Sequence, residues 1–172
     1  MKINVFSYAN AEKTFLKNEN FRNNWISIRD FNFEYLYTKM DEYCNNVLAL
    51  QFDDVLKFNV ERNIWHPFYE KECKKRDIIY FNSEMARQII KFSCDIYNKK
   101  QDLNIHCWAG KSRSQAIAFC LNQYFNMFCE NNEEDYIRNL NNSIDDFMGN
   151  ADVIKVLTNE IYCLNSGYQI ID

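Results

Sequence analysis

Short apolar segments alternate with amphipathic ones along most of this chain. Residues 2–6 and 103–106 alternate between apolar and polar side chains, and residues 25–28 and 47–52 form short, mostly apolar segments. Segments of this length and pattern are typical of β-strands, and continuous apolar runs are typical of strands buried on both faces. We therefore predict four strands. Residues 55–80 lack a clear periodicity and are expected to form a surface loop.

Longer segments between and after these strands have helical spacing. We predict helices over residues 9–18, 84–98, 115–128, 133–147 and 151–164, with a short helix within 33–44. In the first helix the expected inner face is Ala11, Phe15 and Leu16. In the helix over 84–98, Ser83 is the expected N-cap, and the apolar stripe is Met85, Ile89, Phe92 and Ile96. Gly149 and Asn150 separate the last two helices.

The order of these elements predicts the fold class. Strands that alternate with helices form parallel sheets covered by helices, with right-handed crossovers. We therefore expect one α/β domain over residues 1–172, with a central, mostly parallel sheet flanked by helices. No repeat, low-complexity tract or linker divides the chain.

Composition and charge narrow the classes of function. The net charge is −4, which argues against general nucleic-acid binding and against binding to anionic membranes. No apolar run is long enough to span a membrane, and residues 1–6 have no signal-peptide pattern, so we expect a cytoplasmic protein. The seven cysteines are scattered without a CxxC pair, and there are two histidines, so neither a disulfide framework nor a structural zinc site is expected.

The segment that carries candidate chemistry joins the strand over 103–106 to the next helix. It reads His106-Cys107-Trp108-Ala109-Gly110-Lys111-Ser112-Arg113-Ser114. A short loop before a helix can offer several backbone N–H groups and the positive helix end to a phosphate. Arg113 can clamp two phosphate oxygens, and Gly110 allows the backbone to turn inward. The same field favours a nucleophilic thiolate at Cys107, and Ser114 can donate a hydrogen bond to it.

This segment resembles the signature loop of the cysteine-based protein tyrosine phosphatases, in which His-Cys, five residues and Arg are followed by Ser or Thr. The size resembles the compact dual-specificity type, especially its bacterial and phage members. The segments Trp25–Asp30, Phe52–Asp54 and 82–98 are similar to that group's other landmarks. The close resemblance covers about residues 45–125.

The resemblance implies a two-step hydrolysis through a phosphocysteine at Cys107, without metal or cofactor. Arg113 would bind the phosphate, and Ser114 would assist departure of the sulfur in the second step. His106 would shape the loop, and the substrate-binding positions would be His106, Trp108, Ala109, Gly110, Lys111 and Ser112. Trp108 either lines the mouth of the pocket or packs under the loop. Lys111 is similar to the loop lysines of the lipid-phosphatase branch.

An aspartate is expected as the general acid, and the sequence leaves three candidates. Asp54 shares a strand face with Leu50 and Phe52 by the period of two, which places it at the strand end. Asp53 is adjacent and points the other way. Asp77 is separated from Cys107 by a spacing closer to the family's habit. Asp54 is the first choice and Asp53 the second.

The expected function is removal of phosphate from phosphotyrosine in proteins, and from phosphoserine or phosphothreonine if specificity is dual. The partner would then be a phosphorylated protein or peptide. Two other hypotheses stay open on the sequence. One is the same chemistry on a phosphoinositide or an RNA 5′-phosphate, and the other is a non-catalytic phosphate-binding module.

Overall fold

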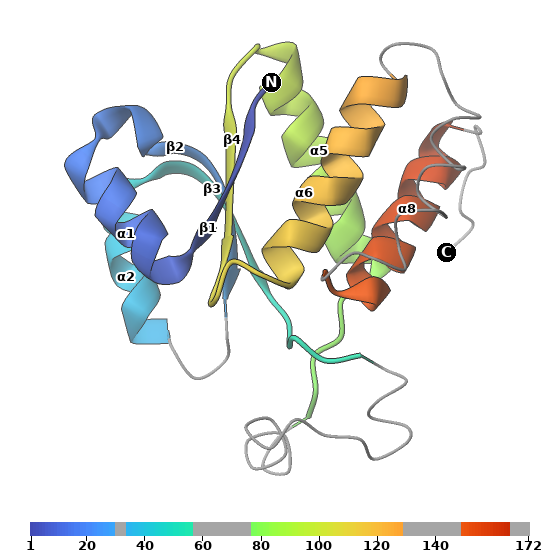
Figure 1. The fold of residues 1–172 in the computed structure, drawn as a ribbon, viewed down its shortest axis with the longest axis horizontal. Helices are drawn as coiled ribbons and strands as arrows, with labels where there is room; N and C mark the ends of the chain where they lie inside the picture. The colour runs from blue at the N-terminus through green and yellow to red at the C-terminus, as the bar shows by residue number, and fades with distance from the viewer. Residues whose placement is uncertain (30–33, 57–76, 129–148, 166–172) are drawn as a thin grey trace.

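The strands form one parallel sheet, which confirms the predicted α/β class. The computed structural model describes residues 1–29, 34–56, 77–128 and 149–165 (Figure 1). The sheet has four strands in the order β1-β4-β2-β3, and all neighbours are parallel. In chain order the strands are β1 (Ile3–Ser7), β2 (Asn23–Arg29), β3 (Asn45–Gln51) and β4 (Leu103–Cys107).

Helices cover both faces of the sheet. In chain order the helical elements are α1 (Tyr8–Lys17), the 3₁₀ turn η1 (Glu19–Phe21), α2 (Glu34–Tyr43), α5 (Ser83–Asn98), α6 (Arg113–Gln123), the π-helical turn η2 (Tyr124–Phe128) and α8 (Ala151–Asn165). Figure 1 shows α1 and α2 on one side of the sheet and α5, α6 and α8 on the other. The sheet is therefore the middle of three layers.

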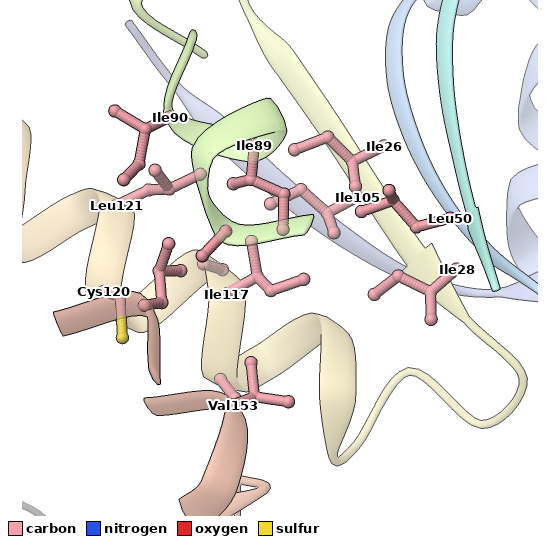
Figure 2. Close-up of a cluster of buried hydrophobic side chains, with 14 of the residues drawn as sticks. Ile26, Ile28, Leu50, Ile89, Ile90, Ile105, Ile117, Cys120, Leu121 and Val153 are labelled. Atoms are coloured by element: carbon pink, nitrogen blue, oxygen red, sulfur yellow. The ribbon is translucent and has the colours of Figure 1, made fainter. Parts of the chain in front are cut away.

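The side chains of β2 alternate between the two layers of helices, as the strand period of two requires. Ile26 and Ile28 join the larger core cluster with α5, α6 and α8, part of which is drawn in Figure 2. Trp25 joins a second cluster with Ala11 and Phe15 of α1. All three β2 side chains are fully buried, so the strand is anchored on both faces.

The strand at the centre of the fold is β4. All five of its residues are buried, because β1 and β2 flank it and helices lie over both faces. In the register, Ser7 of β1 lies beside Cys107, and Ser27 of β2 lies beside His106. Because all strands are parallel, the residues that follow β1, β3 and β4 reach the same edge of the sheet as Cys107.

Two details of the predicted helices are wrong. Leu16 was expected on the inner face of α1 but is 38% exposed, because the buried side of that helix is formed by Tyr8, Ala11 and Phe15. The N-cap of α5 is Asn82 rather than Ser83, since the Asn82 side chain accepts a hydrogen bond from the backbone N–H of Met85.

The other helices differ from prediction mainly in their boundaries. The stripe of α5 is rotated, so that Ile89 and Ile96 are buried whereas Met85 and Phe92 are only partly buried. Helix α6 begins at Arg113, two residues earlier than predicted, and passes into η2 after Gln123. The expected helix over 133–147 and most of the loop over 55–80 lie outside the described residues. Within the described ranges, no helix has the length and apolarity that a membrane crossing requires.

Candidate active site

The loop over residues 108–112 connects β4 to α6 at the carboxyl edge of the sheet. Ser112 occupies the N-cap position of α6, but its side chain makes no capping hydrogen bond. Its hydroxyl instead donates to Asp54 Oδ1 at 2.7 Å. A helix N-terminus left without a side-chain cap offers N–H groups and a positive dipole end to an anion.

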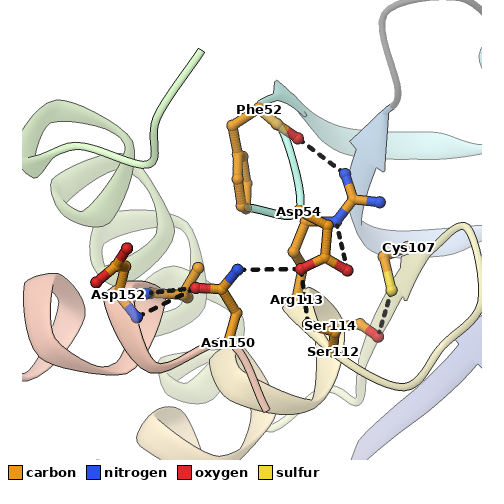
Figure 3. A network of polar contacts seen from close by, with 9 residues as sticks. Phe52, Asp54, Cys107, Ser112, Arg113, Ser114, Asn150 and Asp152 are labelled. Carbon is orange, nitrogen blue, oxygen red and sulfur yellow. Dashed lines mark hydrogen bonds and ion pairs between the residues drawn. The ribbon is translucent and has the colours of Figure 1, made fainter. Parts of the chain in front are cut away.

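Cys107 and Ser114 meet at the base of this loop. The Cys107 Sγ lies 3.1 Å from the Ser114 Oγ, and both side chains are buried (Figure 3). A hydroxyl at this distance can donate a hydrogen bond to a thiolate and stabilise its negative charge. The sequence places these residues seven positions apart, and the strand-loop-helix turn brings them into contact.

Arg113 is buried at the start of α6 with its guanidinium turned toward the end of β3. Its Nη1 donates to the Phe52 carbonyl oxygen at 2.8 Å, and its Nε lies 3.6 Å from Asp54 Oδ2. The guanidinium carbon also lies 5.9 Å from the centre of the Phe52 ring. These contacts fix a planar cation at the start of α6, one residue before Ser114, with little side-chain freedom left to lose when an anion binds.

Gly110 fits the loop closely against the junction of β1 and α1. Its φ is +70°, in the left-handed region, and a Cβ built on it would lie 2.5 Å from the Ser7 backbone nitrogen. The Gln115 side chain donates to the Gly110 carbonyl oxygen at 3.2 Å. Both the backbone conformation and the close approach therefore require glycine at this position.

Trp108 follows the candidate nucleophile directly and shows features of both sequence alternatives. Its ring stacks on Tyr8 with 6.3 Å between centroids and 8° between planes, yet the residue is 45% exposed. Its carbonyl oxygen accepts a hydrogen bond from the Tyr8 backbone N–H at 3.1 Å. Two other loop residues, Ala109 and Lys111, are exposed.

His106 is fully buried, and its surroundings keep it neutral. Its Nε2 lies 2.8 Å from the Ser27 Oγ, and Tyr8 and Trp25 contact the ring at their edges. Burial lowers the His106 pKa to about 3. With so low a pKa this histidine is neutral at physiological pH, and its contact with Ser27 joins β4 to β2.

The three candidate aspartates lie in different surroundings. Asp54 faces the loop, where it accepts the hydrogen bond from Ser112 and lies beside the Arg113 guanidinium. Asp53 is buried and makes two hydrogen bonds to the backbone of Ile79. Its Oδ2 accepts from the Ile79 N–H at 2.9 Å, and its own backbone N–H donates to the Ile79 carbonyl oxygen at 2.8 Å. Asp77 is exposed.

Asn150 completes the network around Asp54, and the sequence reasoning did not include it among the site residues. Its Nδ2 donates to Asp54 Oδ1 at 3.0 Å, while its Oδ1 accepts from the backbone N–H groups of Asp152 and Val153 (Figure 3). An Asn before a predicted helix indicates an N-cap. No sequence pattern indicates that the other half of this amide reaches a residue 96 positions away.

A cavity of about 290 Å³ lies beside this network. Its lining includes Asp53, Tyr80, Phe81, Asn150, Val153 and Val156. No residue of the loop over 108–112 lines it, so the cavity neighbours the candidate phosphate site without forming it. Among the described residues, no group of three or more His, Cys, Asp or Glu side chains could hold a metal ion.

Comparison with known proteins adds a structural relative. A scan against protein-family models finds no match, and neither does a search of curated proteins. Among solved structures, the chain is similar to the crystal structure of PTPMT1. The TM-score is 0.52 at 13% sequence identity, and the match covers 96% of this chain and 93% of that one. The chain shares the fold of that structure.

The match covers almost all of the chain, and the fold therefore agrees with the expectation drawn from the loop sequence. At this level of identity the likeness carries the fold alone. What the site does is inferred from Cys107, Arg113 and the groups that surround them.

Proposed function

We propose that this protein hydrolyses phosphate monoesters, with phosphotyrosine in proteins as the main substrate and phosphoserine and phosphothreonine as further substrates of the same chemistry. The observation that carries the proposal is the contact of the Cys107 thiol with Ser114 at the start of α6, beside the buried Arg113. A nucleophile, a fixed cation and a helix N-terminus on one loop are the groups that phosphoryl transfer needs.

In the first step the Cys107 sulfur attacks phosphorus and forms the S–P bond. The P–O bond to the leaving group breaks on the opposite side, and the leaving oxygen takes a proton from Asp54. Arg113 and the backbone N–H groups of the loop stabilise the charge on the three remaining oxygens. Asp54 is favoured as the acid because it faces the loop, whereas Asp53 is bonded to Ile79.

In the second step water attacks phosphorus and gives a proton to the Asp54 carboxylate. The S–P bond breaks, inorganic phosphate leaves, and the thiolate returns with the Ser114 hydroxyl as its hydrogen-bond donor. Asn150 orients Asp54 in both steps, because its amide is itself fixed by the first turn of α8. General acid–base catalysis of this kind contributes about 10²- to 10⁴-fold.

A protein substrate is favoured over a polyanionic one by charge. The chain carries a net charge of −4, and Lys111 is the one lysine within the 108–112 loop. Ligands with several phosphates, such as inositol phosphates or triphosphate-ended RNA, are bound through several cations at the site. A single phosphate on a peptide side chain needs only the loop and Arg113.

Replacement of the nucleophile tests the reaction. We expect Cys107→Ser to abolish turnover of a phosphotyrosine peptide and of p-nitrophenyl phosphate, while the variant still binds the phosphopeptide. Cys163→Ser is the matched control, because Cys163 lies on α8 away from the loop and is only partly buried. Near-wild-type turnover by Cys107→Ser would show that the mechanism is wrong.

A substrate panel separates the remaining hypotheses. Phosphopeptides, inositol phosphates and triphosphate-ended RNA are compared by kcat/KM under the same conditions. A higher kcat/KM for inositol phosphates or for triphosphate-ended RNA would contradict the proposal that the substrate is a phosphorylated protein. Absence of a burst with p-nitrophenyl phosphate, together with insensitivity to vanadate, would indicate a phosphate-binding module instead.

A further inference from the structure

Trp108 is a large aromatic residue beside the nucleophile that the reaction steps above do not use. It is 45% exposed, although tryptophan is among the most buried residues on average. One face of its ring is covered by the nearly parallel ring of Tyr8, which is itself buried. A tryptophan that stacks on a buried ring and is still 45% exposed offers part of its aromatic surface to a ligand.

The order of the strands places this surface on one side of the phosphate site. Tyr8 directly follows β1, Cys107 ends β4, and Asp54 comes just after β3. Strands β1 and β3 lie on opposite sides of β4 in the sheet order β1-β4-β2-β3 (Figure 1). Tyr8, which follows β1, and Asp54, which comes after β3, therefore lie on opposite sides of Cys107 at the same edge. Trp108, stacked on Tyr8, therefore lies on the side of Cys107 opposite Asp54.

The geometry of the reaction places the leaving group between these two sides. In-line displacement puts the leaving oxygen opposite the attacking sulfur, so the leaving group extends outward from the loop. Asp54 must reach the leaving oxygen from its side. The remainder of the leaving group then passes along the Trp108 side of the opening.

We infer that Trp108 is a specificity-determining residue, and that the exposed part of its ring stacks on an aromatic ring in the leaving group and selects phosphate esters with such a ring over esters with an aliphatic leaving group. This inference rests on the proposed phosphatase function and names its preferred substrate class, phosphotyrosine. Stacking by a residue held in place by Tyr8 costs little conformational entropy on binding. The backbone hydrogen bond from Tyr8 to the Trp108 carbonyl oxygen fixes the same contact.

The test compares two ligands that differ in aromaticity and little in size. Benzylphosphonate and cyclohexylmethylphosphonate are bound to Cys107→Ser in an otherwise wild-type chain and in chains that also carry Trp108→Leu or Trp108→Phe. Affinity is measured by calorimetry. We expect Trp108→Leu to reduce the preference for the aromatic ligand by about three- to ten-fold, as the loss of one aromatic pair predicts. Trp108→Phe should retain most of the preference.

The same comparison by turnover uses benzyl and cyclohexylmethyl phosphate with the intact nucleophile, so that the two leaving oxygens have similar chemistry. Tyr162→Ala is the matched control, because Tyr162 is also 45% exposed but lies toward the other end of α8. We expect it to leave the ratio of the two kcat/KM values unchanged.

The outcomes separate this inference from the proposed function. If the Cys107→Ser chain with Trp108 intact binds neither phosphonate and wild-type protein hydrolyses neither ester, the proposed function fails. If wild-type protein is active and Trp108→Leu leaves the aromatic preference unchanged, the role of Trp108 is wrong. A misfolded variant would lose both ligands together, and Trp108→Phe would then decide through the ratio it retains.

Discussion

Gly110 shows how far a single residue constrains the candidate phosphate loop. Its positive φ and its approach to Phe6 and Ser7 leave no space for a side chain. The loop is thereby pressed onto the start of α1, where Trp108 also makes its contacts. The loop can adopt this conformation only because glycine has no Cβ atom.

We predict that Gly110→Ala lowers the free energy of unfolding by about 1–3 kcal/mol, because alanine at a left-handed φ is strained and its Cβ meets backbone atoms. Phosphatase activity should fall with it, as the loop shifts away from β1. Denaturant unfolding measures the change. Ala109→Ser, at the exposed neighbouring position, should stay within about 0.5 kcal/mol of wild type. Equal stability of the two variants would contradict the tight fit.

Asp54 and Asp53 are adjacent in sequence but differ in what their side chains contact, and this difference predicts different kinetics. Asp54→Asn should lower kcat about 10²- to 10⁴-fold on substrates with poor leaving groups, and far less on p-nitrophenyl phosphate, which needs little protonation. Asp53→Asn should show no such dependence on the leaving group. Its effect should be on stability, because Asp53 holds the backbone of Ile79. The reverse pattern would make Asp53 the acid.

At the scale of elements, Asn150 couples a helix to the site. Its side-chain oxygen accepts two hydrogen bonds from the first turn of α8, and its side-chain nitrogen donates a hydrogen bond to Asp54. Since α8 packs in the larger core cluster through Val153, Ile154 and Leu157, the position of Asp54 is tied to that core.

Substitution of Asn150 can separate these two contacts. Asn150→Ser keeps a good N-cap but is too short to reach Asp54, so we expect stability within about 0.5 kcal/mol of wild type. Its kcat on poor leaving groups should fall by about ten-fold, with a smaller fall on p-nitrophenyl phosphate. Asn82→Ala is the control: it removes the N-cap of α5, which costs about 1 kcal/mol, and should spare catalysis. An unchanged kcat for Asn150→Ser would show that Asn150 only caps its helix.

At the scale of the whole molecule, the two central strands are joined by a buried polar pair. His106 on β4 contacts Ser27 on β2, and neither side chain reaches solvent. Burial lowers the pKa of His106 from 6.5 to about 3. Between about pH 3 and pH 6.5, His106 is therefore neutral in the folded protein and protonated in the unfolded chain.

The sign of the pH effect follows from this difference. Between about pH 3 and pH 6.5 the unfolded chain holds more protons, so stability is lost as the pH falls. We predict that protonation of His106 in the unfolded chain lowers the free energy of unfolding by about 2 kcal/mol as the pH falls from about 7 to about 5. His106→Gln should flatten this slope, measured by urea unfolding at each pH, whatever its effect on absolute stability. An unchanged slope for His106→Gln would contradict a neutral, buried His106.

The local sequence pattern predicts much of the fold but less of the candidate site. The four strands and the helices at 9–18, 84–98 and 151–164 were predicted within a few residues, because one apolar face or run suffices to place such elements. Details that depend on contacts with other elements are not predicted by these patterns. Leu16 is exposed although its spacing is apolar, and Asn82 caps α5 although Ser83 was equally suitable by type. The strand period favours Asp54 as the acid, although β3 ends at Gln51, before Asp54.

The sequence by itself determined the element order and the chemistry of the 106–114 loop, because both depend on residues close together in the chain. The tertiary structure decided which distant groups that loop meets. Ser112 bonds Asp54 across 58 positions, and Asn150 bonds it across 96. Tyr8 reaches Trp108 because β1 lies beside β4. Such contacts follow from strand order and helix docking, which depend on the packing of the whole core and on no local periodicity.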